Sequence, residues 1–101
     1  MTQKELAKRL ASTGLPVAYQ AFRTRQAPPF VCYLFAYDSQ FYADDGMYFS
    51  AGRYQVELYT STKDPVIEAR VEAVLAGLCW EKSEEYIDEE KIYQITYEIE
   101  V

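Results

Sequence analysis

Apolar and polar side chains alternate most cleanly over the last ten residues, 92–101, and again over 53–60. A period of two is typical of a strand with one buried face, because successive side chains of a strand point to opposite sides. In the earlier segment, Tyr54, Val56 and Leu58 share one side. We therefore expect two strands whose apolar faces belong to one core. The apolar side of the last strand consists of Tyr93, Ile95, Tyr97, Ile99 and Val101.

A period of three to four residues instead predicts an amphipathic helix over 2–13. Leu6 and Leu10 lie four residues apart on one narrow apolar stripe. Thr2 and Glu5 have the spacing of a capping box, and a glycine and a proline follow the last turn. The narrow stripe indicates a short helix that docks on a sheet.

A second helix is expected from residue 65 to about residue 76. Asp64 can cap its first turn, and the proline that follows fits the first helical position, where no donor is needed. Glu68, Arg70 and Glu72 are expected to point away from the core. The expected core-facing stripe consists of Ile67, Val71, Val74, Leu75 and Leu78.

The most apolar run, 30–39, is followed by a turn signal at Gly46 and by a long strand, 47–60. Both sides of the run are apolar, which leaves two interpretations open. Helices cover one face and a neighbouring subunit or a long loop covers the other, or its outer tyrosines simply face water. The two strands predict a long hairpin with a tip more apolar than water exposure favours. The candidate interface residues of this tip are Phe41, Tyr42, Asp44, Asp45 and Tyr48.

Two further strands are expected at 17–22 and 79–87, and a charged tight turn at 88–91 leads into the last strand. The predicted chain order is helix, strand, strand, strand, helix, strand, strand. Consecutive strands with short turns predict an antiparallel sheet of about five strands with both helices packed on one face, which is an α+β fold. A chain of 101 residues is expected to form a single domain, spanning 1–101.

The net charge of −6 lies in the last fifth of the chain. Acidic and basic side chains cancel over 1–80, whereas acidic residues dominate 81–101. An acidic surface repels phosphate backbones, so direct binding of nucleic acid is disfavoured, and ordinary solubility is the simplest explanation for the charge. A basic protein partner would also be compatible. The candidate interface residues of this acidic hairpin are Glu84, Glu85, Glu89 and Glu90.

The sequence offers little for catalysis. It contains no histidine, so the usual general base is missing. Asp44 and Asp45 are typical of a turn. Together with Asp38 they could gather a divalent cation, but their spacing does not match a calcium loop. Cys32 and Cys79 resemble buried small hydrophobes. We therefore expect no catalytic, cofactor-binding or metal site, and neither a membrane span nor a signal peptide, which predicts synthesis in the cytoplasm.

Several stretches along the chain form a recognisable set. They are Gly14-Leu15-Pro16-Val17-Ala18-Tyr19, Phe41-Tyr42-Ala43-Asp44, Tyr54-Gln55-Val56-Glu57-Leu58-Tyr59-Thr60, Lys63-Asp64-Pro65 with Glu68, Glu84-Glu85-Tyr86-Ile87 and Tyr93-Gln94-Ile95-Thr96-Tyr97-Glu98-Ile99. Together they resemble small tail-completion or minor structural proteins from phages and prophages of Gram-positive bacteria, and their layout is similar to that of the tail-terminator family of long-tailed phages. The resemblance covers nearly the whole chain, and its motifs are structural.

This resemblance implies a non-enzymatic subunit that forms a ring, typically of six copies. The ring caps the tail tube, offers a surface to the head-connector proteins and later lets DNA pass as cargo, so the protein is expected in the virion after assembly in the host cytoplasm. An acidic lumen would suit passing DNA. Two alternatives stay open: a head–tail connector or neck protein, and a small prophage-encoded binding or regulatory module.

Overall fold

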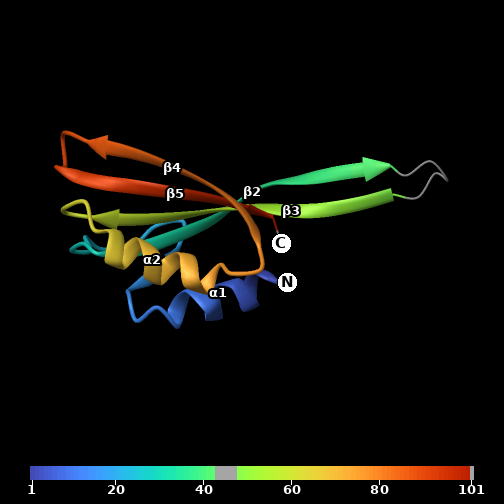
Figure 1. Ribbon diagram of the computed structural model, residues 1–101, viewed down its shortest axis with the longest axis horizontal. Coiled ribbons are helices and arrows are strands. Elements are labelled where there is room, and N and C mark those ends of the chain that lie inside the picture. The colour runs from blue at the N-terminus through green and yellow to red at the C-terminus, as the bar shows by residue number, and fades with distance from the viewer. Residues whose placement is uncertain (43–47, 101) are drawn as a thin grey trace.

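The computed structural model describes residues 1–42 and 48–100, without the side chains of 38–42 and 48–51. Within these residues it holds two helices and five strands (Figure 1), and the predicted element order and α+β class are confirmed. In chain order the elements are α1 (Gln3–Ala11), β1 (Val17–Tyr19), β2 (Phe30–Tyr42), β3 (Tyr48–Thr60), α2 (Pro65–Val74), β4 (Cys79–Ile87) and β5 (Ile92–Glu100).

The five strands form one sheet in the order β1-β2-β3-β5-β4. Three pairings are antiparallel, but β1 runs parallel to β2, so the sheet is mixed and the expectation of a wholly antiparallel sheet is wrong at this edge. Gln20 adopts φ 67, which is incompatible with an extended strand, so β1 ends after three residues instead of reaching residue 22. Segment 20–29 then returns the chain to the level where β1 began, and β2 therefore runs in the same direction.

Both helices lie on one face of the sheet, below it in Figure 1, as expected from the sequence. Apolar residues of both helices meet those of β2, β3 and β5 in one core. The alternation in β3 and β5 is thereby confirmed as the pattern of a buried face. The buried core residues are Leu6, Leu10, Val31, Tyr33, Tyr54, Val56, Leu58, Val71, Leu75, Ile95, Tyr97 and Ile99.

Both helices begin where the sequence predicted a cap. The Thr2 hydroxyl accepts a hydrogen bond from the backbone N–H of Glu5 at 3.1 Å. The Asp64 carboxylate accepts one from the N–H of Ile67 at 3.2 Å. Each bond satisfies a donor that the first helical turn leaves free, so the local sequence fixes where each helix starts.

A buried carboxylate on α2 contradicts the expected outward orientation of Glu68. This residue is 2% exposed, and its carboxylate lies 2.8 Å from Lys63 Nζ and 2.7 Å from Lys82 Nζ. Burial alone would raise the pKa of Glu68, but hydrogen bonds from the two lysines outweigh burial and lower this pKa. Lys82 belongs to β4, so the ion pairs tie α2 to the edge of the sheet.

The next acidic residue of α2, Glu72, also turns toward the sheet. It accepts hydrogen bonds from the Tyr97 hydroxyl at 2.7 Å and from Lys82 Nζ at 2.8 Å. Tyr97 is fully buried, and its hydroxyl is its only polar side-chain atom. The hydrogen bond to Glu72 therefore gives this buried hydroxyl a partner. Of the three charged residues expected to point away, only Arg70 is exposed.

Candidate functional site

The β2–β3 hairpin extends well past the rest of the molecule, toward the right of Figure 1. The two strands pair from Phe30 with Tyr59 to Tyr42 with Tyr48. β5 reaches β3 only as far as Arg53, so 38–42 and 48–52 form a two-stranded ribbon, which we call the arm. The arm makes the long axis of the molecule 51 Å, against 27 and 25 Å for the other two axes.

The root of the arm is held to the body by side chains of β5. Arg53 lies 3.2 Å from the Glu100 carboxylate, and the Tyr37 hydroxyl donates to Glu98 at 3.3 Å. On the opposite face, the rings of Phe35 and Tyr54 meet edge to face at 5.5 Å. A register shift between Phe35 and Tyr37 marks a bulge at this root, where the ribbon leaves the body.

The predicted tip residues fall at the far end of the arm. Phe41 pairs in register with Phe49, and Tyr42 with Tyr48, so aromatic residues are register partners at the end of the ribbon. β2 continues three residues past its expected end at residue 39. Asp44 and Asp45, also predicted as interface residues, lie outside the described residues.

The four predicted interface residues of the acidic hairpin do not form one surface. Glu84 lies on the helix side of β4 and pairs with Lys63. Glu85 is opposite Gln94 in the sheet and lies on the other side. Glu89 and Glu90 belong to the exposed turn that follows β4. The expectation that the acidic hairpin presents these four residues as one surface is therefore wrong, because strand alternation sends Glu84 and Glu85 to opposite faces of the sheet.

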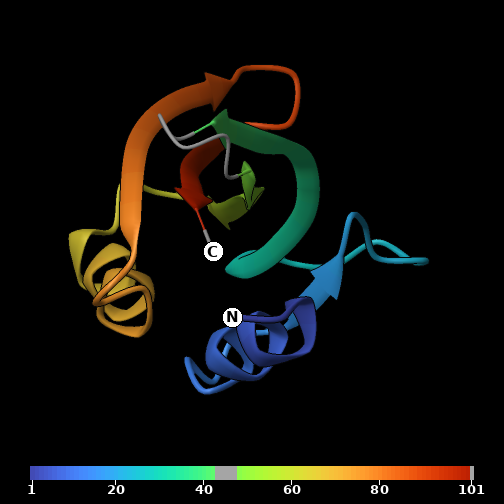
Figure 2. The same cartoon turned by 90° about the vertical axis from the view of Figure 1, so that its right-hand side faces the viewer.

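The sheet face turned away from the helices is acidic over β3, β5 and β4. We call it the open face, and Figure 2, seen from the arm end, shows the helices gathered on the other side. Alternation and register place on it the carboxylates of Glu57, Glu81, Glu85, Glu98 and Glu100, together with Arg53. Glu57 carries no local signal in the sequence. Only the pairing of β3 with β5 reveals that it joins the C-terminal acidic residues.

One part of the open face is locked by hydrogen bonds. Gln94 Nε2 donates to the Glu57 carboxylate at 2.9 Å and to the Tyr59 hydroxyl at 3.1 Å. The Tyr59 hydroxyl in turn donates to Glu57 at 3.2 Å. Burial and the neighbouring Glu57 carboxylate raise the pKa of Tyr59, so its hydroxyl remains a donor across the neutral range. This cluster fixes side chains and presents no free nucleophile.

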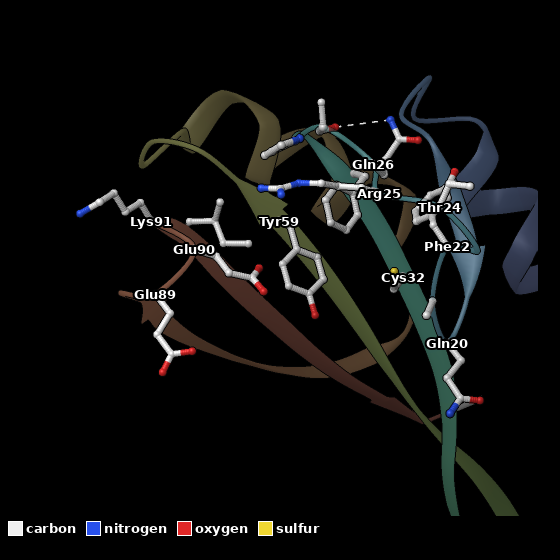
Figure 3. A pocket seen from close by; sticks show the side chains of 15 residues that line it. Gln20, Phe22, Thr24, Arg25, Gln26, Cys32, Tyr59, Glu89, Glu90 and Lys91 are labelled. Carbon is white, nitrogen blue, oxygen red and sulfur yellow. Dashed lines mark hydrogen bonds between the residues drawn. The ribbon is translucent and has the colours of Figure 1, made fainter.

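A cavity of about 810 Å³ lies at the end of the open face remote from the arm (Figure 3). Segment 20–28 forms one wall and the turn at 89–92 forms the other. Arg25 extends from the first wall toward the turn that carries Glu90, above the Tyr59 ring. The cavity is open and lined by both charges, which differs from the closed apolar pocket of a typical small-molecule site.

The described residues show little that supports redox or metal chemistry. Cys32 is buried as expected, but Cys79 at the start of the edge strand β4 is exposed, so the expectation of a buried Cys79 is wrong. Burial, and to a lesser extent Glu57, raises the pKa of the Cys32 thiol, which disfavours the reactive thiolate. Over 1–42 and 48–100, no group of three or more Cys, Asp or Glu side chains is placed to hold a metal ion. No helix in this part of the chain is both long and apolar enough to cross a bilayer.

Comparison with known protein families and with curated proteins finds no match to this chain.

Proposed function

We propose that this protein is a non-enzymatic structural subunit of a phage tail or head–tail junction. In this proposal copies of the chain form a ring, typically of six, that caps the tail tube and joins it to the head. The phage setting comes from the sequence resemblance, which spans nearly the whole chain. The subunit role is the part that the geometry supports.

The arm is the observation that carries the subunit role. An isolated two-stranded ribbon is marginally stable in water, because each strand leaves one edge of backbone groups without partners. This arm also bears aromatic residues at its far end, and aromatic residues are enriched at protein interfaces. A ribbon of this kind is best explained by contacts that form in an assembly.

The open face supports the passage of DNA through the proposed ring. Its carboxylates would repel phosphate groups, so a duplex would slide past without binding. We therefore place the open face, with Glu57, Glu81 and Glu98, toward the lumen. Of the acidic residues singled out in the sequence, Glu85 shares this face, whereas Glu84 does not.

Mass in solution tests the proposal. The intact chain is measured by sedimentation over a range of concentrations, alone and with the tail-tube protein of the same phage. We expect a ring-sized species that binds the tube. A chain that stays monomeric in both samples, at every concentration, would overturn the assignment.

Two other candidates predict different results. A head–tail connector would also form a ring, but labelling in purified particles would place it on the portal side. A small regulatory module would stay monomeric and bind a ligand. The cavity near Arg25 is open and carries both charges, so the ligand-binding alternative has less support than assembly.

A further inference from the structure

The outer edge of β2 continues past the short strand β1. β1 pairs only with Val31, Cys32 and Tyr33 of β2, so the outer edge of β2 from Leu34 to Tyr42 lacks a partner strand among the described residues. At the opposite end of the sheet, the outer edge of β4 over Cys79–Ile87 pairs with no other strand in the described part of the chain.

Hydrogen bonds show which residues of β2 direct their backbone groups outward. The N–H of Val31 donates to the Pro16 carbonyl, and the Tyr33 carbonyl accepts from Gln20. The N–H of Phe35 is next in this series, and it donates to the Tyr19 hydroxyl at 3.1 Å. The Tyr19 hydroxyl is therefore the last group of β1 that bonds to the outer edge of β2. Phe35 is the first residue of this edge beyond β1 that directs its backbone groups outward.

The same alternation can be followed across the sheet to β4. In an antiparallel ladder, directly opposed residues alternate between hydrogen-bonded and non-hydrogen-bonded pairs. The backbone groups of Phe35 point outward, away from β3, so Phe35 and its register partner Tyr54 form a non-bonded pair. The backbone N–H and C=O of Tyr54 therefore point away from β2, toward β5. Tyr54 lies opposite Ile99, and Ile99 opposite Trp80. The outward residues of β4 are therefore the even-numbered ones, Trp80 to Tyr86.

We propose that β4 of a second copy of this chain pairs with the open edge of β2 and continues the sheet from one copy to the next. This inference rests on the proposed function, because head-to-tail contacts of this kind are the ones that can close into a ring. β4 runs opposite to β2, so copies related by rotation meet in the preferred antiparallel sense.

Aligning Phe35 with Tyr86 gives the register that fits the available space. Both residues lie on the helix side of their strands, both direct backbone groups outward, and both are exposed, at 41% and 45%. In this register, Leu34 meets Ile87, and the incoming strand ends beside Tyr19, the last residue of β1. The N–H of Phe35 then exchanges its hydrogen bond to the Tyr19 hydroxyl for one to the carbonyl of Tyr86. An exposed aromatic residue on each partner is thereby covered by the other.

The two edges differ in chemistry. A full antiparallel overlap of β4 with its own copy would place Glu81 opposite Glu85 and Lys82 opposite Glu84, so repulsive and attractive pairs balance and charge gives this pairing no advantage. Pairing with β2 instead places the apolar residues Leu34 and Phe35 beside Ile87 and Tyr86. The β2 and β4 edges can therefore act as two different ends of one subunit.

Cysteine cross-linking tests the contact directly. In a bonded antiparallel pair the Cα atoms lie about 5.5 Å apart, which a disulfide can bridge. The full chain is made as Phe35→Cys with Tyr86→Cys, in a Cys79→Ser background that removes the exposed native thiol. After mild oxidation, a non-reducing gel should show a ladder of covalent oligomers. The two single-cysteine variants are the controls, and neither should give more than a trace of dimer.

A charge exchange provides the second arm. Phe35→Glu or Tyr86→Lys alone should weaken self-association by roughly fivefold at each contact, and the double variant should recover most of it. Circular dichroism checks that each exposed-site variant folds. Dimers from Phe35→Cys alone would show that two β2 edges pair and would overturn the inference.

The outcomes separate this inference from the proposed function. Sedimentation is run on the same samples. Ring-sized assemblies without the Phe35–Tyr86 cross-link would refute this contact and leave the subunit role standing. A chain that neither cross-links nor associates at any concentration would refute the contact. If this chain also failed to bind the tail-tube protein, the proposed function would be refuted too.

Discussion

The body and the arm are built from the same two strands but are stabilised in different ways. In the body, β2 and β3 are flanked by other strands and covered by two helices, and Leu58 and Val56 are fully buried. In the arm, the same strands pair only with each other among the residues that the structure describes. One chain thus contains a self-sufficient fold and an extension that gains little from folding alone. We infer that the body supplies stability and the arm supplies contacts.

The largest expected effect is in the body. Ile95→Ala removes a fully buried side chain from the centre of β5 and should lower the free energy of unfolding by about 2–5 kcal/mol. Urea denaturation measures the loss. Val66, which is 72% exposed on α2, offers the control, and Val66→Ala should stay within about 0.5 kcal/mol of the wild type. Similar losses in the two variants would contradict the assignment of the core.

A smaller effect is expected where α2 is tied to β4. Glu68→Gln keeps the shape of the side chain but removes the charge that two lysines face, and should cost about 1–3 kcal/mol. Exposed Glu81 supplies the matched control, and Glu81→Gln should have little effect on unfolding.

The ion pairs of α2 also predict acid sensitivity. The folded state lowers the pKa of Glu68 and Glu72, so their contribution is fully present above the ordinary carboxyl pKa. It is lost as the pH falls through their lowered pKa values, because the folded state must then take up protons. Urea midpoints measured from pH 7 down to pH 3 should fall, and the fall should be shallower in Glu68→Gln. Identical slopes would contradict this origin.

The smallest expected effect on stability comes from Glu84 and Glu85, which are neighbours in sequence but lie on opposite faces of the sheet. Glu84→Lys places a second positive charge beside Lys63 and should lower the urea midpoint slightly. Glu85→Lys, on the open face, should leave the midpoint unchanged but weaken the repulsion of DNA, measured as retention of duplex by the proposed ring. Equal behaviour of the two variants would mean that the division between the faces has no consequence.

Local patterns predicted most of the body. Capping residues fixed the starts of both helices, and period-two alternation identified the buried faces of β3 and β5. These features depend on residues close together in the sequence, which is why the sequence alone reveals them. The element order and the α+β class followed from them.

Features that depend on distant residues were missed. The parallel placement of β1 depends on the path of segment 20–29, and the burial of Glu68 depends on Lys82 from another element. The acidic hairpin was interpreted as one surface because its residues are adjacent in sequence, whereas strand alternation sends Glu84 and Glu85 to opposite faces. Strand pairing also adds Glu57 to the open face, which composition could not indicate.

Removing the arm tests the central claim most directly. Tyr37 and Arg53 are register partners, so residues 38–52 can be replaced by an Asn-Gly turn that closes the shortened hairpin. The free energy of unfolding and the sedimentation mass with tail-tube protein are then measured for the wild type and the shortened chain. We predict that stability changes by less than about 1 kcal/mol while the ring-sized, tube-bound species disappears. A shortened chain that unfolds, or one that still assembles on the tube like the wild type, would contradict the division between body and arm.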